Sequence, residues 1–364
     1  MPNLFGTLPT RARQRAVLHD QARSQAMKNL NDIYKRVERY DNTHIHPQSY
    51  ASLDIKCGTF LLDRDGKSLD AKENCSLPFF EPRGASWIPN LNITDARMRE
   101  TFQVFNDNWD AVLTSGLMRE RPKTQAYSVC SWLEHMFSYF TRESSHPNVA
   151  SLSKWRHSGK LIPEIFAERF YLAAFPYNRY STYAVYASKK QLSSTKTTAP
   201  HTLITIAIGE EPSEDLFKAE AMIIAAAMIS RLEGDECKAY SVIPITLVTA
   251  MGGMQARVIQ AHSSGQSLVL SKTKVFDFAT NQMATANIDI LLGLMGSDQV
   301  GDPADPDHIL KVEVQQVVTQ QGSDHKRFQS IRKFFRPARE TSAASWESRK
   351  CSTPRPQIPQ PWRL

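Results

Sequence analysis

The sequence predicts an α+β or α/β protein in which a central mixed sheet carries flanking helices. Two almost continuous apolar runs, at 202–208 and 242–248, are typical of strands that are covered on both faces. Between them, apolar residues repeat at helical spacing over 213–232. A buried strand, a helix and a second buried strand in this order favour a sheet with a helix packed against it.

The N-terminal part, residues 1–160, is predicted to be mainly helical with one small β element. Apolar residues recur at three- and four-residue spacing in several segments, which is the pattern of a helix with one buried face. The helices expected on this basis are 10–40, 94–116 and one that begins after Pro122. A short β element is expected at 53–66, because Asp65-Gly66 is a hairpin signal.

The next part, residues 161–322, is predicted to form the α/β core with closing helices. We expect the sheet to lie within 180–295. The expected elements, in order, are a helix at 165–174, strands at 182–187 and 202–208, a helix at 213–232 capped by Ser213, strands at 242–248, 255–262, 267–271 and 274–278, and helices at 281–294 and 308–320. A polar loop at 189–200 separates the first two strands.

The C-terminal part, residues 323–364, is predicted to be a disordered, basic tail that contains proline. From Asp324 onward the chain has ten Lys or Arg residues and three Asp or Glu residues, so the tail holds the whole net charge of +7. The residues expected to contact a polyanion or another partner are Lys326, Arg327, Arg332, Lys333, Arg336 and Arg339. Nucleic acid, an acidic protein, an anionic membrane surface or an import receptor are the alternatives, beside a tail that only aids solubility.

Cysteine spacing and the length of the apolar runs indicate which cellular location to expect. The five cysteines are scattered and contain no CxxC pair, which indicates reduced thiols and not a disulfide framework or zinc ribbon. The chain has no run of about 18 apolar residues, so no transmembrane segment is expected. A cytoplasmic or nuclear location is therefore expected.

The best catalytic candidates by position are acidic residues between the strand at 202–208 and the following helix. They are Glu210, Glu211, Glu214, Asp215 and Glu220. Sites in α/β proteins are common at the ends of strands. The competing interpretation is that these acids complement the positive end of the helix dipole. His44 and His46 have a spacing that suits a metal in a strand, but Pro47 favours a loop. No metal and no cofactor are expected.

Four segments resemble the PD-(D/E)XK nuclease-like domains found in fungal proteins. They are Ser181–Tyr186, His201–Gly209, Lys218–Met222 and Val242–Ile245, with the later strands in similar order. The resemblance covers about a third of the chain, over residues 180–295, and rests on the order of elements. It implies a nuclease-like core in which carboxylates hold a divalent metal and a lysine helps to activate water.

This sequence departs from that family at the residues that carry the reaction. Thr182 stands where the resemblance implies the first acid, and Ala207 and Gly209 stand where it implies the second acid and the lysine. Glu220, Lys218 and Glu211 are the candidates for a site that has migrated to neighbouring positions. The resemblance therefore implies a nuclease-like fold without the nuclease reaction.

Two classes of function follow. The first is a non-catalytic intracellular protein with a degenerate core and an interaction or regulatory role. The second is an accessory enzyme of a fungal biosynthetic pathway, with its active site near the acidic corner or in the aromatic N-terminal part. Binding of nucleic acid through the basic tail is a further alternative. The sequence favours a protein that is not an enzyme.

Overall fold

The computed structural model describes residues 8–69, 79–91, 93, 95–114, 122–140, 147–158, 180–188, 199–306 and 309. The helix expected at 165–174, the polar loop at 189–198, most of the helix expected at 308–320 and the whole basic tail lie outside these residues.

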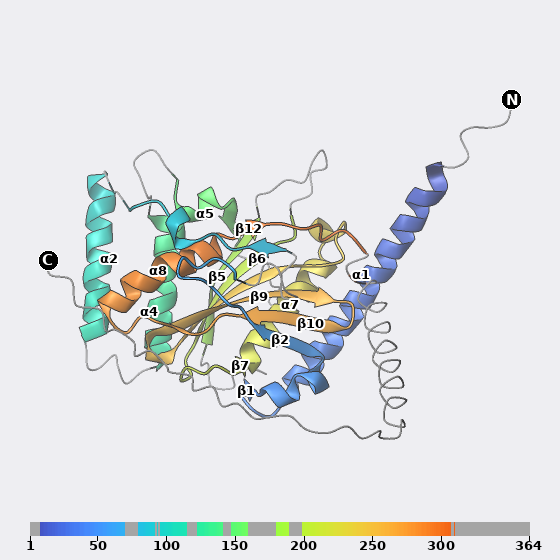
Figure 1. Cartoon of the computed structure of the whole chain (residues 1–364), viewed down its shortest axis with the longest axis horizontal. Coiled ribbons are helices and arrows are strands. Elements are labelled where there is room, and N and C mark those ends of the chain that lie inside the picture. The colour runs from blue at the N-terminus through green and yellow to red at the C-terminus, as the bar shows by residue number, and fades with distance from the viewer. Residues whose placement is uncertain are drawn as a thin grey trace, which may run out of the picture. The chain divides into compact units, whose positions relative to one another are not determined.

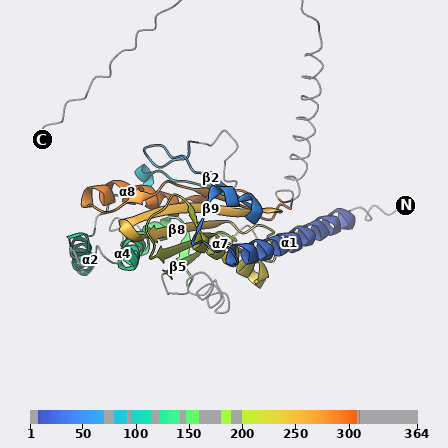
Figure 2. The same cartoon turned by 90° about the horizontal axis from the view of Figure 1, so that it is seen from below.

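The helices confirm most of the segments expected from apolar periodicity (Figure 1). They are α1 (Leu8–Glu38), α2 (Ala96–Thr114), α4 (Pro122–Glu134), α5 (Val149–Leu152), α7 (Lys218–Glu233) and α8 (Asn281–Met295), with a π-helical turn at His135–Tyr139. Short 3-10 turns lie at Pro47–Ser49, Ala51–Leu53, Ala85–Trp87, Asp235–Cys237 and Gly252–Met254. In both views α1 and α7 lie together, and α2, α4 and α8 gather at the other end (Figures 1 and 2).

The strands of the central sheet are β2 (Ile55–Thr59), β4 (Trp155–His157), β5 (Tyr180–Ser188), β6 (Thr202–Ile208), β8 (Ile245–Met251), β9 (Gln255–Ser264), β10 (Ser267–Lys272) and β11 (Phe276–Asp277). Two small sheets pair β1 (His44–Ile45) with β7 (Leu216–Phe217) and β3 (Phe80–Glu81) with β12 (Asp298–Gln299).

The central sheet is mixed, as the sequence predicted. Its strand order is β2-β10-β9-β8-β6-β5-β4, and β11 pairs with β9. The pairs β10–β2 and β6–β8 are parallel, and the other pairs are antiparallel. Helix α7 makes the crossover that a parallel β6–β8 pair requires. The sheet draws β2 and β4 from the first 160 residues and its remaining strands from the segment after them.

Both faces of the sheet are covered near its centre. Every residue of β6 and β8 is buried, which explains why the two runs are almost continuously apolar. Helix α7 covers one face and packs against α1. Helix α4 covers the other face, where a side chain added at Gly252 would meet Pro122, the first residue of α4.

The start of α7 differs from the prediction. The helix begins at Lys218 and not near Ser213. Residues 216–217 instead form β7, whose pairing partner β1 lies more than 160 residues earlier in the chain. The Ser213 hydroxyl accepts a hydrogen bond from the Asp215 amide, and the helix start is stabilised by Glu220, which accepts from the Phe217 amide at 2.8 Å. A distant strand pairing thus overrode a local capping signal.

The predicted Asp-Gly turn is confirmed. The Lys67 amide donates to the Asp63 side chain, and Leu62 forms an isolated antiparallel bridge with Ser68. Gly66 has φ of 83°, which a residue with a Cβ rarely adopts. The β strand expected beside this turn does not form its own hairpin, because β2 joins the edge of the central sheet beside β10.

Candidate functional site

The strand register gives the backbone positions of the residues that stand where the nuclease resemblance implies charges. The strand register places Thr182 opposite Ile206, and Ala207 opposite Ser181. The backbone therefore does not align Thr182 with Ala207. Gly209 follows the last residue of β6 and is half-buried.

Ala207 lies in a row of three alanines. It pairs with Ala250 in β8, and Ala250 pairs with Ala256 in β9. All three are at most 2% exposed. Helix α4 contacts β6, β8 and β9, and its Cys130 thiol donates to the Ile206 carbonyl at 3.0 Å. Small side chains are what such a close approach requires, so this position serves packing of α4.

The opposite face of the sheet carries a buried ion pair between Glu220 and Arg257. Both side chains are fully buried. Arg257 Nε donates to Glu220 Oε1 at 2.8 Å, and a second guanidinium nitrogen donates to Oε2. Two further N–H groups of the guanidinium donate to the carbonyls of Ser213 and Asp215, each at 2.8 Å, and the guanidinium lies over the Phe217 ring. Arg257 therefore bonds both to the Glu220 carboxylate and to two backbone carbonyls of the segment before α7.

Electrostatics hold Arg257 in its charged form. Burial alone would lower its pKa, but the adjacent Glu220 carboxylate and its hydrogen bonds outweigh that effect, so the pKa lies above its usual value. Both side chains are fully buried and bonded to each other, so neither is exposed to a substrate or a metal ion.

Two further acids of the predicted cluster are also paired. Asp215 Oδ2 lies 2.7 Å from His46 Nδ1, and Glu214 lies 3.4 Å from Lys272 Nζ. Glu214 also accepts a hydrogen bond from the Val275 amide at 3.2 Å. His46 thus bonds a carboxylate, and within the described part of the chain no group of three His, Cys, Asp or Glu side chains is arranged to hold a metal ion.

The residues considered for a migrated site are dispersed. Lys218 Nζ donates to the Tyr40 carbonyl at 2.7 Å, and burial lowers the pKa of its amine despite nearby Glu38 and Asp41. Glu211 is exposed. The structure therefore brings Glu220 to Arg257, and it does not bring Glu220, Lys218 and Glu211 together.

A thiol and a phenol lie next to this charged network. Burial raises the pKa of Cys57 and of Tyr50. A raised pKa keeps the Cys57 sulfur protonated at neutral pH, and a thiol is a much weaker nucleophile than a thiolate. The local chemistry therefore does not favour covalent catalysis by Cys57.

Sequence reasoning missed Arg257, the partner of the residue it singled out. The signal was present, because Arg257 interrupts an apolar strand and Glu220 interrupts an apolar helix. Charged residues at such positions are almost never buried without a partner of opposite sign. The predicted tail contacts, 326–339, lie outside the described residues.

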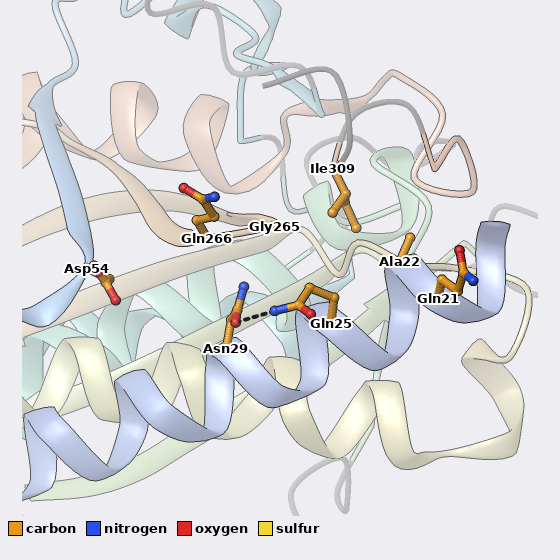
Figure 3. Close-up of a pocket in the computed structure, with 8 residues that line it drawn as sticks. All are labelled: Gln21, Ala22, Gln25, Asn29, Asp54, Gly265, Gln266 and Ile309. Atoms are coloured by element: carbon orange, nitrogen blue, oxygen red, sulfur yellow. Dashed lines mark hydrogen bonds between the residues drawn. The ribbon is translucent and has the colours of Figure 1, made fainter. Parts of the chain in front are cut away.

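A recess of about 540 Å³ lies between α1 and the β9–β10 turn. Figure 3 shows the residues that line it. It is lined by Gln21, Ala22, Gln25, Asn29, Asp54, Gly265, Gln266 and Ile309. Gln25 donates to Asn29 at 2.8 Å, and Asp54 is 2.5 Å from Arg36. Amides dominate the described lining of this recess, and the one carboxylate among those residues, Asp54, is paired with Arg36.

No protein-family model, no curated protein and no solved structure matches this chain. Among the described residues, no helix is long and apolar enough to span a membrane. The fold and the site together define an α+β protein with a buried ion pair between Glu220 and Arg257.

Proposed function

We propose that this protein is a non-catalytic interaction protein built on a degenerate nuclease-like core. The observation that carries the proposal is the engagement of Glu220 with Arg257. Glu220 is the acid best placed to replace a missing nuclease ligand, and both of its oxygens bond to Arg257 within the core. A carboxylate bound in this way is not available to hold a metal.

A second feature supports the same proposal. Ala207, where the resemblance implies an acid, lies under α4 and is 2% exposed. A carboxylate there would be desolvated against the Cys130 thiol and the sheet, at a cost of several kcal/mol if it were unpaired. The position therefore suits helix packing better than metal binding.

The interaction role rests on charge. The body is electrically neutral and the segment from Asp324 onward carries the net charge of +7. Six basic residues between Lys326 and Arg339 are interleaved with Phe328, Phe334 and Phe335. Such a segment attracts polyanions and can add apolar contacts once bound. We therefore propose an acidic partner, nucleic acid or acidic protein, for the tail.

Truncation after Gly322 tests this role. We expect the affinity of the truncated chain for poly(dT) or polyglutamate to fall at least tenfold. Without the basic tail, binding would release far fewer counterions from the polymer, and this release favours binding. The dependence of affinity on salt should flatten in parallel. The measurement is fluorescence anisotropy over a salt series, with a preference for one polymer separating the two partner classes.

The matched control keeps the length of the tail and replaces its clustered basic residues with glutamine. The substituted residues are Lys326, Arg327, Arg332, Lys333, Arg336 and Arg339. This variant should bind as weakly as the truncated chain. Unchanged binding in both variants would place the contact elsewhere, with the basic helix α1 as the next candidate.

A further inference from the structure

Strand β2 lies at one edge of the central sheet, where β10 is the only described strand that pairs with it (Figure 1). The pairing is parallel and matches Ile55–Thr59 with Leu268–Lys272. An edge strand has an outer side on which its N–H and C=O groups can pair with another extended chain.

Two hydrogen bonds fix which backbone groups of β2 point outward. The Leu268 amide donates to the Asp54 carbonyl at 2.9 Å, and the Phe60 amide donates to the Lys272 carbonyl at 2.7 Å. In a parallel pair, alternate residues of each strand bond to the neighbouring strand. The residues of β2 that point away from β10 are therefore Ile55, Cys57 and Thr59.

The outward groups of Cys57 and Thr59 are unpaired. Ile55 differs, because its amide donates to the Tyr50 carbonyl at 2.9 Å. Among the residues that the structure describes, no hydrogen bond involves the backbone N–H or C=O of Cys57 or Thr59. Thr59 is exposed and Cys57 is half-buried. Two donors and two acceptors are thus available to an added strand.

The chain itself closes both ends of this open edge. At one end the Tyr50 carbonyl accepts the outward amide of Ile55, and at the other end the Leu69 amide donates to the carbonyl of Leu61 at 3.0 Å. A second copy of β2 would bring the same two closures with it, and these would collide with the first pair. A flexible peptide has no such flanking segments, so it fits the open edge better than a second copy does.

Side chains beside the open edge indicate which peptide it fits. Lys56 is exposed and takes part in none of the ion pairs found among the described residues. Leu61 and Leu69 are 50% and 62% exposed. Opposite charges and apolar pairs across neighbouring strands are favourable. Gly58 presents no side chain, so the residue opposite it can be a large ring.

We propose that the outer edge of β2 binds an acidic, partly apolar peptide as an added antiparallel strand. Main-chain hydrogen bonds to Cys57 and Thr59 supply affinity, and the neighbouring side chains supply selectivity. From its N-terminus, the peptide places an apolar residue opposite Thr59, an aromatic residue opposite Gly58, a β-branched residue opposite Cys57 and an acid opposite Lys56. This surface belongs to the body and does not depend on the basic tail.

The acetylated and amidated peptide Ser-Leu-Phe-Val-Glu-Ser tests the proposal against the full chain. Ligand-observed NMR titration should give a Kd of about 1 mM or tighter. N-methylation of its valine removes the N–H that donates to the Cys57 carbonyl and should weaken binding at least about tenfold. N-methylation of its phenylalanine is the matched control and should have little effect, because that N–H points away from β2.

Variants of the protein locate the peptide. Thr59→Pro removes an outward N–H, which edge strands tolerate, and should weaken binding at least about threefold. Thr59→Val keeps the N–H and should bind as the wild type does. Lys56→Glu should weaken binding about 2–5-fold and should prefer a peptide with lysine in place of glutamate. Truncation after Gly322 should leave binding unchanged, which separates this surface from the tail.

Circular dichroism melting shows whether each variant is folded, and the two N-methylated peptides decide the outcome with the wild type alone if Thr59→Pro is not. No binding by the wild type at several times the expected Kd would overturn the proposal. Equal binding of the unmodified and valine-methylated peptides would exclude an added strand. Dimerisation of the wild type that Thr59→Pro abolishes would assign the edge to a second copy instead.

Discussion

The Glu220→Ala variant is expected to lose about 3–5 kcal/mol of unfolding free energy. This is the range for removing one partner of a buried ion pair, because the other charge is left unpaired in the core. In this variant the charge left without its ion-pair partner would be that of Arg257, whose side chain is fully buried. The substitution also removes the acceptor for the Phe217 amide at the start of α7. Urea unfolding followed by circular dichroism measures the change.

Two controls distinguish the effect of breaking a buried ion pair from the effect of removing any carboxylate in this region. Glu211→Ala removes an exposed acid near the same strand-to-helix corner and should stay within about 0.5 kcal/mol of wild type. The double variant Glu220→Leu, Arg257→Met removes both charges and should recover much of the lost stability. A loss below about 1 kcal/mol in Glu220→Ala would mean that the pair is not buried as described.

The Gly293→Ala variant is expected to lose about 1–3 kcal/mol. Helix propensity alone predicts a gain of about 1 kcal/mol from replacing glycine inside α8. However, an added Cβ at Gly293 would fall well inside van der Waals contact with the Arg83 carbonyl oxygen. Because backbone cannot move aside as a flexible side chain can, the steric cost should exceed the propensity gain.

Gly234→Ala is the matched control. Gly234 has φ of −72°, and the nearest atom to an added Cβ is the Ser230 carbonyl oxygen at 3.5 Å, an ordinary contact. The reduced entropy of the unfolded chain should make this variant neutral or more stable by up to about 1 kcal/mol. Thermal unfolding of the two variants side by side checks the contrast, and equal stability would contradict the close packing of α8 on the Arg83 backbone.

Local patterns were sufficient to predict the elements of the core. The run 202–208 is the central strand β6, and the run 242–248 predicts the central strand β8, which lies three residues further along, at Ile245–Met251. Helices with one apolar face, such as α1 and α8, were predicted with ends within a few residues. Continuous apolar runs and the 3.6-residue period of a helix with one buried face are both visible in a short window of the chain.

Features that depend on distant partners could not be predicted in the same way. The start of α7 is shifted because Leu216 and Phe217 pair with Ile45 and His44. Likewise, β2 joins the sheet through a parallel pairing with β10, more than 200 residues later. At the site, Glu220 was identified as a candidate, but its role became clear only once Arg257 was found beside it. The chemistry of a side chain depends on its neighbours in space, and these can be far away in the sequence, as Arg257 is from Glu220.

The most direct test of the central claim is a cleavage assay with the purified full chain, on single- and double-stranded DNA and RNA, with Mg²⁺ or Mn²⁺. Thr182, Ala207 and Gly209 cannot supply the charged groups of a metal-dependent nuclease, so we expect no metal-dependent cleavage above that of a mock purification. Lys218→Ala and Glu211→Ala are the useful variants, because neither side chain belongs to the buried ion pair. Metal-dependent cleavage that is present in the wild type and lost in either of these folded variants would contradict the account and establish a migrated active site.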